Sequence, residues 1–343
     1  MQIVGLDIGG ANLKAANGDG QAASRSFAIW RHPEQLAAEL HRLLLALPAA
    51  DGFAVTMTAE LADCFETKAE GVAAVLSAIV EVAGNRPVIA WQTGGEFVEA
   101  EVAPEIPLLV SAANWHALAT FTGRLAPDGA ALLLDIGTTT TDIIPLLDGV
   151  PIPRGLTDLQ RLQSGELVYS GVSRTPVCAV VPEVTYDGHP CGVAAEAFAT
   201  TADVYLLTGD RPEDSSDHDT PDGRSSTRHR AAARLARMLC CDSSELSVED
   251  LEQIADEIAA AQGQRIGDAL QRVLARSTAP CQRFLISGSG CFLAHRLLEN
   301  HPVLSKIDRV DLSKCFSGAV ATAACAYAVA RLAGERATHL LSR

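Results

Sequence analysis

The stretch LDIGGANLKAA at residues 6–16 returns in altered form as LDIGTTTTDII at residues 134–144. Aligning the two places Asp7 over Asp135 and superimposes the glycines that follow two residues later. Each stretch has the pattern of a buried strand, a tight turn and a second strand, which is typical of a β-hairpin. Because the same unit occurs twice, the chain is expected to contain two copies of one α/β unit.

Strands that end in Asp-x-Gly are suited to binding phosphate. The turn presents backbone N–H groups and small hydroxyls to phosphate oxygens while the aspartate faces the same gap. Since Mg²⁺ takes carboxylate oxygens and keeps much of its water, Asp7 and Asp135 are predicted to hold it directly or through water. A single aspartate of this kind has a turn-capping alternative, but the duplication favours a clamp on one polyphosphate. The residues predicted to contact phosphate are Gly9, Gly10, Asn12, Lys14, Gly137, Thr138, Thr139 and Thr140.

Two further features bear on this predicted site. Lys14 lies where its ammonium can neutralise a phosphate and assist catalysis, and a solvated strand lysine is the alternative. The run FLISGSG at residues 284–290 indicates a strand and a glycine-rich turn that lets a ligand or helix approach the backbone. An ordinary strand-to-helix turn is the alternative for Gly288, Ser289 and Gly290.

The remaining pattern alternates short apolar strands with helices, as expected for α/β domains. One segment, residues 209–229, has almost no apolar side chain, which predicts a mobile polar surface loop. Helices are expected over 33–46, 68–83, 115–121, 230–239, 248–276 and 317–333, with another beginning near 291. For the arginines at 230, 234 and 237, which share a helix face, a solvated face is favoured over a phosphate site.

Size and composition limit the class of protein. With 343 residues and 48% hydrophobic content, two domains are expected. The formal net charge of −15 argues against a nucleic-acid partner. The nine cysteines form no C-x-x-C pair, which indicates reduced thiols. The sequence predicts neither a signal peptide nor a membrane span, and hence a cytoplasmic monomer or small homo-oligomer.

Three motifs in order carry a resemblance to the actin-like ATPase superfamily (sugar kinases, heat-shock proteins and actins). LDIGGANLKAA is similar to its first phosphate motif, LLLDIGTTTTDIIPL to its second and FLISGSGCFLAHRL to its adenosine motif. With the Thr-rich turn, SGELVYSGVSRTPV at 164–177 and AFATTADVYLLTGD at 197–210 resemble the hydantoinase/oxoprolinase-like branch. Within it, the chain is similar to the proteins of tetrahydromethanopterin-linked one-carbon transfer, the (aminomethyl)furan-methanamine synthases of methanofuran-type cofactor synthesis.

The resemblance implies a transferase that joins an (aminomethyl)furan-methyl diphosphate to a phenolic, tyramine-like or tyrosine-like acceptor and releases diphosphate. Mg²⁺ is the implied cofactor, and ATP is possible but not required. Small-molecule diphosphate and phenolic amine substrates are then the partners. Two rival functions share the motifs: an ATP-dependent kinase or oxoprolinase-like amide hydrolase, and a non-catalytic nucleotide-binding module.

A phenolic acceptor needs a base, because its pKa lies near 10. Glu166 is the first candidate, and a residue that caps or pairs within a turn is its alternative. Asp142 is the second, and ordering the hairpin or holding a metal-bound water is its alternative. His189 is the third, and a surface loop residue is the favoured alternative for it. The residues expected to contact substrate are Arg154, Ser164, Tyr169, Arg174, Gly288, Ser289 and Gly290.

The implied architecture is α/β, with two RNase H-like domains of mixed sheets and the active site in the cleft between them. The first domain is expected to comprise residues 1–129 and 317–343 and to carry the first phosphate motif. The second is expected to comprise residues 130–316 and to carry the second phosphate motif and the adenosine-like motif.

Overall fold

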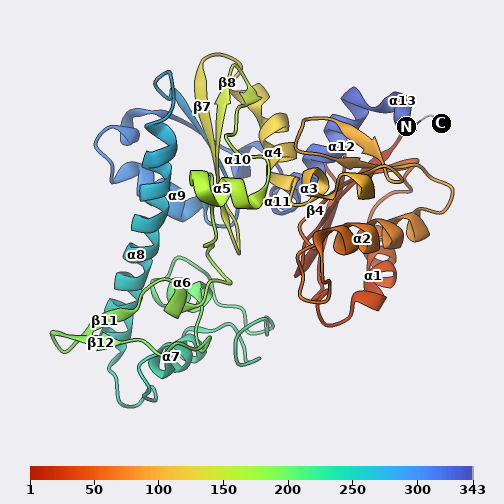
Figure 1. The fold of residues 1–343 in the computed structure, drawn as a ribbon. Coiled ribbons are helices and arrows are strands. Elements are labelled where there is room, and N and C mark those ends of the chain that lie inside the picture. Colours follow the sequence, from red (N-terminus) through yellow and green to blue (C-terminus); the bar gives the residue numbers. More distant parts are fainter. Residues whose placement is uncertain (342–343) are drawn as a thin grey trace.

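The computed structural model describes residues 1–341, which form two sheet-containing lobes and a helical extension (Figure 1). The first lobe has a six-stranded sheet of order β3-β2-β1-β4-β5-β6. Strands β1, β4 and β5 are parallel, whereas β2, β3 and β6 run antiparallel to their neighbours. Its strands are β1 (Ile3–Ile8), β2 (Asn12–Asn17), β3 (Ala22–Ser26), β4 (Gly52–Met57), β5 (Val88–Trp91) and β6 (Phe97–Glu99).

Two amphipathic helices, α1 (Leu36–Leu44) and α2 (Lys68–Ala83), cover one face of this sheet. Their apolar side chains share a core with the strands, including Leu40 and Val75 against Leu6 and Val55. Helix α2 has the bounds that the sequence predicts, because Thr67 caps its first turn and Gly84 follows its last residue. The short helix α3 (Pro107–Val110) then leads towards the junction with the second lobe.

The second lobe contains a sheet of order β10-β8-β7-β13-β14, with β9 paired to β8. Strands β7, β13 and β14 are parallel, and β8 is antiparallel to β7. Its strands are β7 (Ala130–Ile136), β8 (Thr141–Leu147), β9 (Val150–Pro151), β10 (Leu167–Val168), β13 (Arg283–Ser287) and β14 (Asp308–Asp311). The helices around it are α5 (Asp158–Ser164), α8 (Val248–Leu274), α9 (Cys291–Glu299) and α10 (Leu312–Cys315).

The predicted sequence repeat is confirmed as a repeat of hairpin geometry. Asp7 lies opposite Lys14 across β1 and β2, and Asp135 lies opposite Asp142 across β7 and β8. Both turns are closed by the same backbone hydrogen bond, 3.0 Å long between the N–H of residue 9 and the carbonyl of 12, and 2.8 Å between 137 and 140. The two halves therefore present equivalent turns, with opposite charges at the second-strand position.

Helices α4 (Asn114–Thr122) and α12 (Ala324–Arg336) join the lobes. A single hydrophobic core contains residues of both helices and of both sheets. The close approach of α12 to β1 requires a glycine, because a Cβ on Gly5 would lie 1.9 Å from the Ala326 carbonyl oxygen. The prediction of one long helix over 317–333 is wrong: α11 (Gly318–Thr322) ends at Thr322. Ala323, with φ −109° and ψ 34°, interrupts the helix before α12 begins. The short α13 (Thr338–Leu341) follows.

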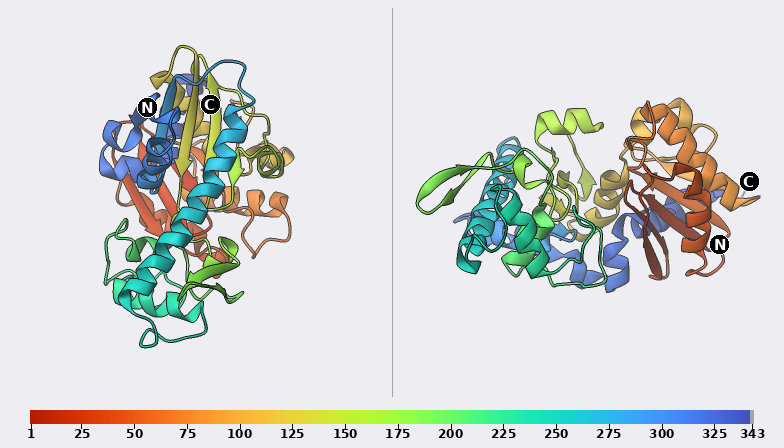
Figure 2. Two further views of the ribbon diagram at one scale, coloured as in Figure 1. Left: turned by 90° about the vertical axis from the view of Figure 1, so that its left-hand side faces the viewer. Right: turned by 90° about the horizontal axis from the view of Figure 1, so that it is seen from below.

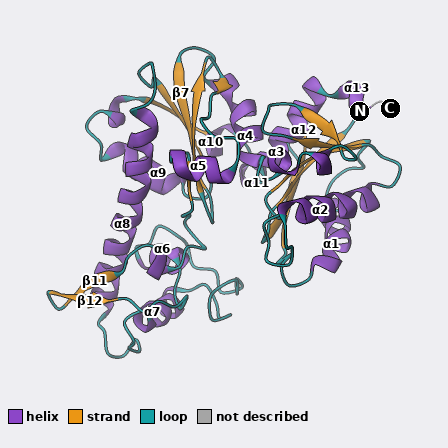
Figure 3. Ribbon diagram, in the orientation of Figure 1, coloured by secondary structure: helices purple, strands orange, loops and turns teal. Residues whose placement is uncertain are grey.

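The 27-residue helix α8 extends away from the second lobe and carries a small third group of elements (Figures 2 and 3). These are β11 (Glu183–Tyr186), β12 (His189–Gly192), α6 (Thr201–Leu207) and α7 (Arg228–Arg237). The polar stretch 209–229 is tied to them, since Asp222 accepts a 3.0 Å hydrogen bond from the fully buried Arg234, which also pairs with Asp203. The solvated arginine face predicted here is thus wrong at Arg234, whereas the mobility of the stretch stays a prediction.

None of the helices within residues 1–341 is long and apolar enough to cross a membrane. All nine cysteines are free thiols, and Cys325 is the buried one.

We expect Gly5→Ala to lower the free energy of unfolding by about 3 kcal/mol, because the added methyl group forces α12 away from β1. Gly318→Ala is the matched control, since a Cβ there would meet nothing within 4 Å. Urea unfolding followed by circular dichroism measures both. Equal stabilities of the two variants would contradict the close packing of α12 on the sheet.

Candidate active site

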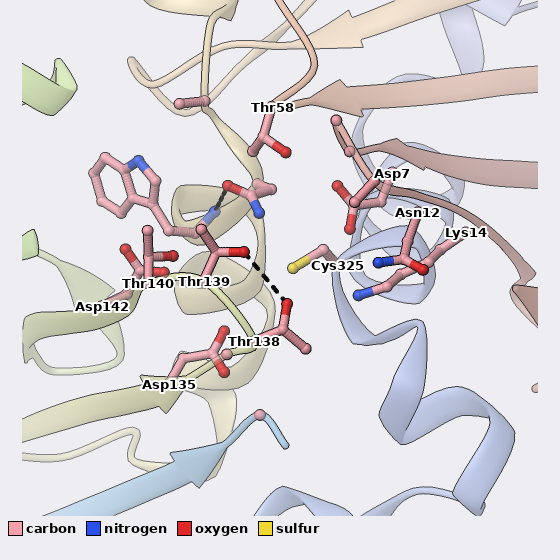
Figure 4. Close-up of a pocket in the computed structure, with 18 of the residues that line it drawn as sticks. Asp7, Asn12, Lys14, Thr58, Asp135, Thr138, Thr139, Thr140, Asp142 and Cys325 are labelled. Atoms are coloured by element: carbon pink, nitrogen blue, oxygen red, sulfur yellow. Dashed lines mark hydrogen bonds between the residues drawn. The ribbon is translucent and has the colours of Figure 1, made fainter. Parts of the chain in front are cut away.

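A cleft of about 700 Å³ lies between the lobes, and both hairpins line it. Figure 4 shows Asp7, Asn12 and Lys14 on one side, Asp135 and the Thr138–Thr140 turn on the other, and Cys325 of α12 between them. The structure brings together most of the residues predicted from the sequence: Asp7, Gly9, Gly10, Asn12, Lys14, Asp135, Gly137, Thr138, Thr139, Thr140, Asp142, Tyr169, Arg174, Gly288 and Ser289.

Asp7 and Asp135, each one residue before the end of its strand, are buried carboxylates whose negative charge is not fully offset by nearby cations. Burial raises the pKa of Asp7, and Lys14 lowers it. Burial raises the pKa of Asp135 to about 7, and the neighbouring Asp142 adds to the rise. Among the described residues, Asp7 Oδ1 has no hydrogen-bond partner. Buried carboxylate oxygens without partners are costly, and a cation between them removes that cost.

These carboxylates fit Mg²⁺ better than a metal that needs a full set of protein ligands. Residues 1–341 contain no group of three or more His, Cys, Asp or Glu side chains placed to hold a metal ion. Mg²⁺ is commonly held by one or two carboxylates, with water and phosphate oxygens completing its octahedron. Asp7 and Asp135 would be its protein ligands.

The glycine-rich turn after β13 packs directly against Asp135. Gly288 has φ +89°, and a Cβ there would lie 2.2 Å from the Ile136 carbonyl oxygen and 2.5 Å from Asp135 Oδ1. The N–H of Gly290 donates a 2.8 Å hydrogen bond to the same Ile136 carbonyl, and Gly290 does not border the cleft. Glycine at 288 therefore allows this turn to support the Asp135 carboxylate.

The segment after β10 packs against the Thr-rich turn and is hydrogen-bonded to its backbone. The N–H groups of Val172 and Ser173 donate 3.0 Å hydrogen bonds to the carbonyls of Gly137 and Thr138. A Cβ on Gly171 would lie 2.5 Å from the Thr138 carbonyl carbon, so the contact needs glycine. The residues that prompted the family resemblance thus set the position of the second hairpin.

Tyr169 and Arg174 belong to the same segment and border the cleft. The Tyr169 side chain is exposed. The Arg174 guanidinium lies 5.2 Å from the centre of the Trp30 ring on the first lobe, and its Nη1 lies 3.6 Å from Asp219 Oδ2 of the polar stretch 209–229. Arg174 is thus placed where both lobes and the polar stretch meet.

Asp142 faces the cleft but is paired. Its carboxylate accepts a hydrogen bond from Arg161, which is 1% exposed and lies 4.0 Å from the centre of the Trp115 ring. Burial raises the pKa of Asp142, and Arg161 lowers it. Sequence reasoning missed Arg161 and Trp115, because α5 and α4 meet the cleft from separate parts of the chain.

Glu166, Arg154 and Ser164 lie outside the cleft lining. Glu166 is 1% exposed, and its carboxylate accepts hydrogen bonds from the N–H groups of Arg154 (2.8 Å) and Gly155 (3.2 Å). Ser164 Oγ donates to the Arg161 carbonyl. Glu166 therefore stabilises a turn, which is the alternative that the sequence left open, and its carboxylate does not reach the cleft.

His189 is exposed on β12, in the third group of elements. Glu60, which the sequence analysis did not single out, borders the cleft, and burial raises its pKa to about 7. No local motif surrounds Glu60, so only the fold could reveal it.

We expect Arg161→Met to lower the free energy of unfolding by about 3–5 kcal/mol, because Asp142 is left as a buried charge without its partner. Adding Asp142→Asn should recover part of this loss. Arg296→Met, which removes a more exposed pair with Asp210, should cost less than about 1 kcal/mol. Urea unfolding measures all three, and equal losses for the two single variants would contradict the buried pair.

Comparison with known proteins identifies the family. Residues 51–335 match the hydantoinase/oxoprolinase family model. The chain is 36% identical over 261 residues to the (4-{4-[2-(gamma-L-glutamylamino)ethyl]phenoxymethyl}furan-2-yl)methanamine synthase of Methanocaldococcus jannaschii, covering 75% of this chain and 77% of that one. The enzyme of the same name from Methanococcus vannielii is 35% identical over 130 residues, covering 38% and 58%.

The fold also has solved counterparts. The nucleotide-free structure of acetone carboxylase superimposes with a TM-score of 0.50 at 11% identity, covering 85% of this chain and 66% of that one. The likeness agrees with the actin-like ATPase fold implied by the three motifs, and both the predicted fold class and the predicted branch are confirmed. The chain belongs to the hydantoinase/oxoprolinase family.

Proposed function

We propose that the protein is a transferase that joins an (aminomethyl)furan-methyl diphosphate to a phenolic amine and releases diphosphate. The observation that carries the proposal is the pair of facing hairpins, with Asp7, Asp135 and Lys14 in one cleft. Support comes from the 36% identical relative, whose name describes a phenoxymethyl-furan methanamine. That name contains the ether bond that the proposed reaction forms.

The reaction exchanges one carbon–oxygen bond for another. The bond between the furan-methyl carbon and the diphosphate oxygen breaks, and the diphosphate leaves with the electron pair. The phenol oxygen then bonds to that carbon and loses its proton. An electron-rich furan ring stabilises positive charge on the methyl carbon, so the main task of the site is to stabilise the departing diphosphate.

The cleft offers groups for that task. We assign the diphosphate to the two turns, where the N–H groups of Gly10 and Thr138 and the Lys14 ammonium would contact its oxygens. Mg²⁺ held by Asp7 and Asp135 would supply further neutralisation of the diphosphate charge. Arg174, which lines the cleft beside Trp30 and Asp219, would add a further cation.

We assign the proton of the phenol to Asp142. Of the three base candidates predicted from the sequence, Asp142 alone borders the cleft. It lies opposite Asp135 in the hairpin, and hence next to the proposed metal and leaving group. Burial raises the pKa of Asp142 despite its pair with Arg161, and a phenol that is attacking a carbocation needs only a weak base.

We expect the purified protein to release diphosphate and form an ether when supplied with Mg²⁺, the furan-methyl diphosphate and tyramine, with nucleotide absent. Chelation of the metal should abolish the release, because the buried carboxylates would then repel the diphosphate. Phosphate analysis and mass spectrometry measure the two products. Turnover that appears only when ATP is added would instead support an ATP-dependent kinase or amide hydrolase.

We expect Asp135→Asn to lower kcat by about 10²–10³-fold, as loss of one strong stabilising group at a reacting centre does. Asp128→Asn is the control, because Asp128 is exposed on the same lobe and does not border the cleft. Steady-state kinetics measure the change, and thermal unfolding verifies the fold. Full activity of Asp135→Asn would exclude this carboxylate as a metal ligand.

A further inference from the structure

Glu60 is held beside the first phosphate turn by the backbone. It lies three residues after β4, and the N–H groups of Thr58 and Ala59 donate hydrogen bonds of 2.8 and 3.0 Å to the Ile8 carbonyl, next to Asp7. On the other side, a Cβ on Gly71 of α2 would lie 2.4 Å from the Glu60 carbonyl oxygen. The backbone of Glu60 is therefore wedged between β1 and α2, at a fixed place in the cleft wall.

The carboxylate of Glu60 is buried and incompletely satisfied. The residue is 1% exposed, yet it borders the cleft. Its Oε2 atom has no hydrogen-bond partner among the described residues. Burial is the main cause of its raised pKa, and the nearby Asp158 raises it further. An unpaired buried carboxylate is unfavourable unless something supplies positive charge or a donor.

The protein's own cations around Glu60 are engaged elsewhere. Lys68, which lowers the pKa of Glu60, lies 3.6 Å from Asp158 Oδ2. Arg161 pairs with Asp142 and also lies near Asp158. Asp63 adds another carboxylate to this wall of the cleft. The cleft wall around Glu60 therefore carries excess negative charge, whereas the backbone N–H groups of the hairpin turns and Lys14 suit phosphate.

We propose that Glu60 binds the primary ammonium of the (aminomethyl)furan donor, an inference that rests on the proposed transferase function. The donor has an anionic diphosphate at one end and an ammonium at the other, and the cleft lining holds a complementary charge for each in Lys14 and Glu60. An ammonium brings three donors and a positive charge, which together satisfy the unpaired oxygen. Glu60 then fixes the direction in which the furan enters, with its methyl carbon at the hairpins.

The test compares two donors and two variants. Glu60→Gln is measured with the natural donor and with an analogue in which a methyl group replaces the aminomethyl group. We expect a loss in kcat/KM of about 30-fold with the natural donor, typical of one charged hydrogen bond, and less than about threefold with the analogue. Glu66→Gln, an exposed change on the same loop outside the cleft, should leave both values unchanged.

Other patterns of kcat/KM loss would overturn the assignment of Glu60 to the donor ammonium. Equal losses with both donors would make Glu60 a base or a structural residue, and thermal unfolding separates these two. A loss that disappears when 4-ethylphenol replaces tyramine would mean that Glu60 binds the amine of the acceptor instead.

A binding measurement separates this inference from the transferase proposal. Calorimetric titration with an (aminomethyl)furan that lacks diphosphate should show binding that Glu60→Gln weakens by about 10-fold or more. If neither donor turns over but this binding persists, the transferase proposal fails and the ammonium site stands. If the wild-type protein and Glu60→Gln bind the amine alike, the inference fails whatever the turnover.

Discussion

The contact on which the structure depends most is the packing of α12 against β1, so close that residue 5 must be a glycine. The same helix shares one hydrophobic core with the second sheet, so the two sheets are held against opposite sides of a common layer formed with α4. This arrangement fixes the distance between the two hairpin turns. The break in the helix at Ala323 then lets α12 begin at the cleft, where Cys325 lies between Asp7 and Asp135.

The two hairpins have the same backbone geometry but differ in the charge of one side chain. The position opposite the aspartate is Lys14 in the first hairpin and Asp142 in the second. Lys14 offsets part of the negative charge at Asp7, while Asp142 needs Arg161 from α5 to be tolerated. The second hairpin is therefore supported by two additional elements, helix α5 and the segment after β10. The two hairpins therefore line the same cleft with unequal charge.

Sequence patterns predicted helices and hairpins correctly where interactions between neighbouring residues set their bounds. The bounds of α2 follow from a threonine cap and a terminal glycine, both visible in the sequence. The Asp-x-Gly hairpins were predictable for the same reason, since their turns close within four residues. The Ala-rich C-terminal helix was predicted as continuous, because its composition gives no sign of the break at Ala323. Burial of Arg234 likewise depends on Asp203 and Asp222 from other segments.

The family, the repeat and the pair of aspartates could be predicted without coordinates, because short motifs with a chemical function carry them. Which other carboxylates border the cleft became visible in the folded chain alone. Glu166, within a recognisable motif, turns away to accept backbone N–H groups, while Glu60, within no motif, is wedged into the cleft wall with one oxygen unpaired. The physical reason is that burial and charge compensation depend on segments distant in the sequence, and no local pattern records them.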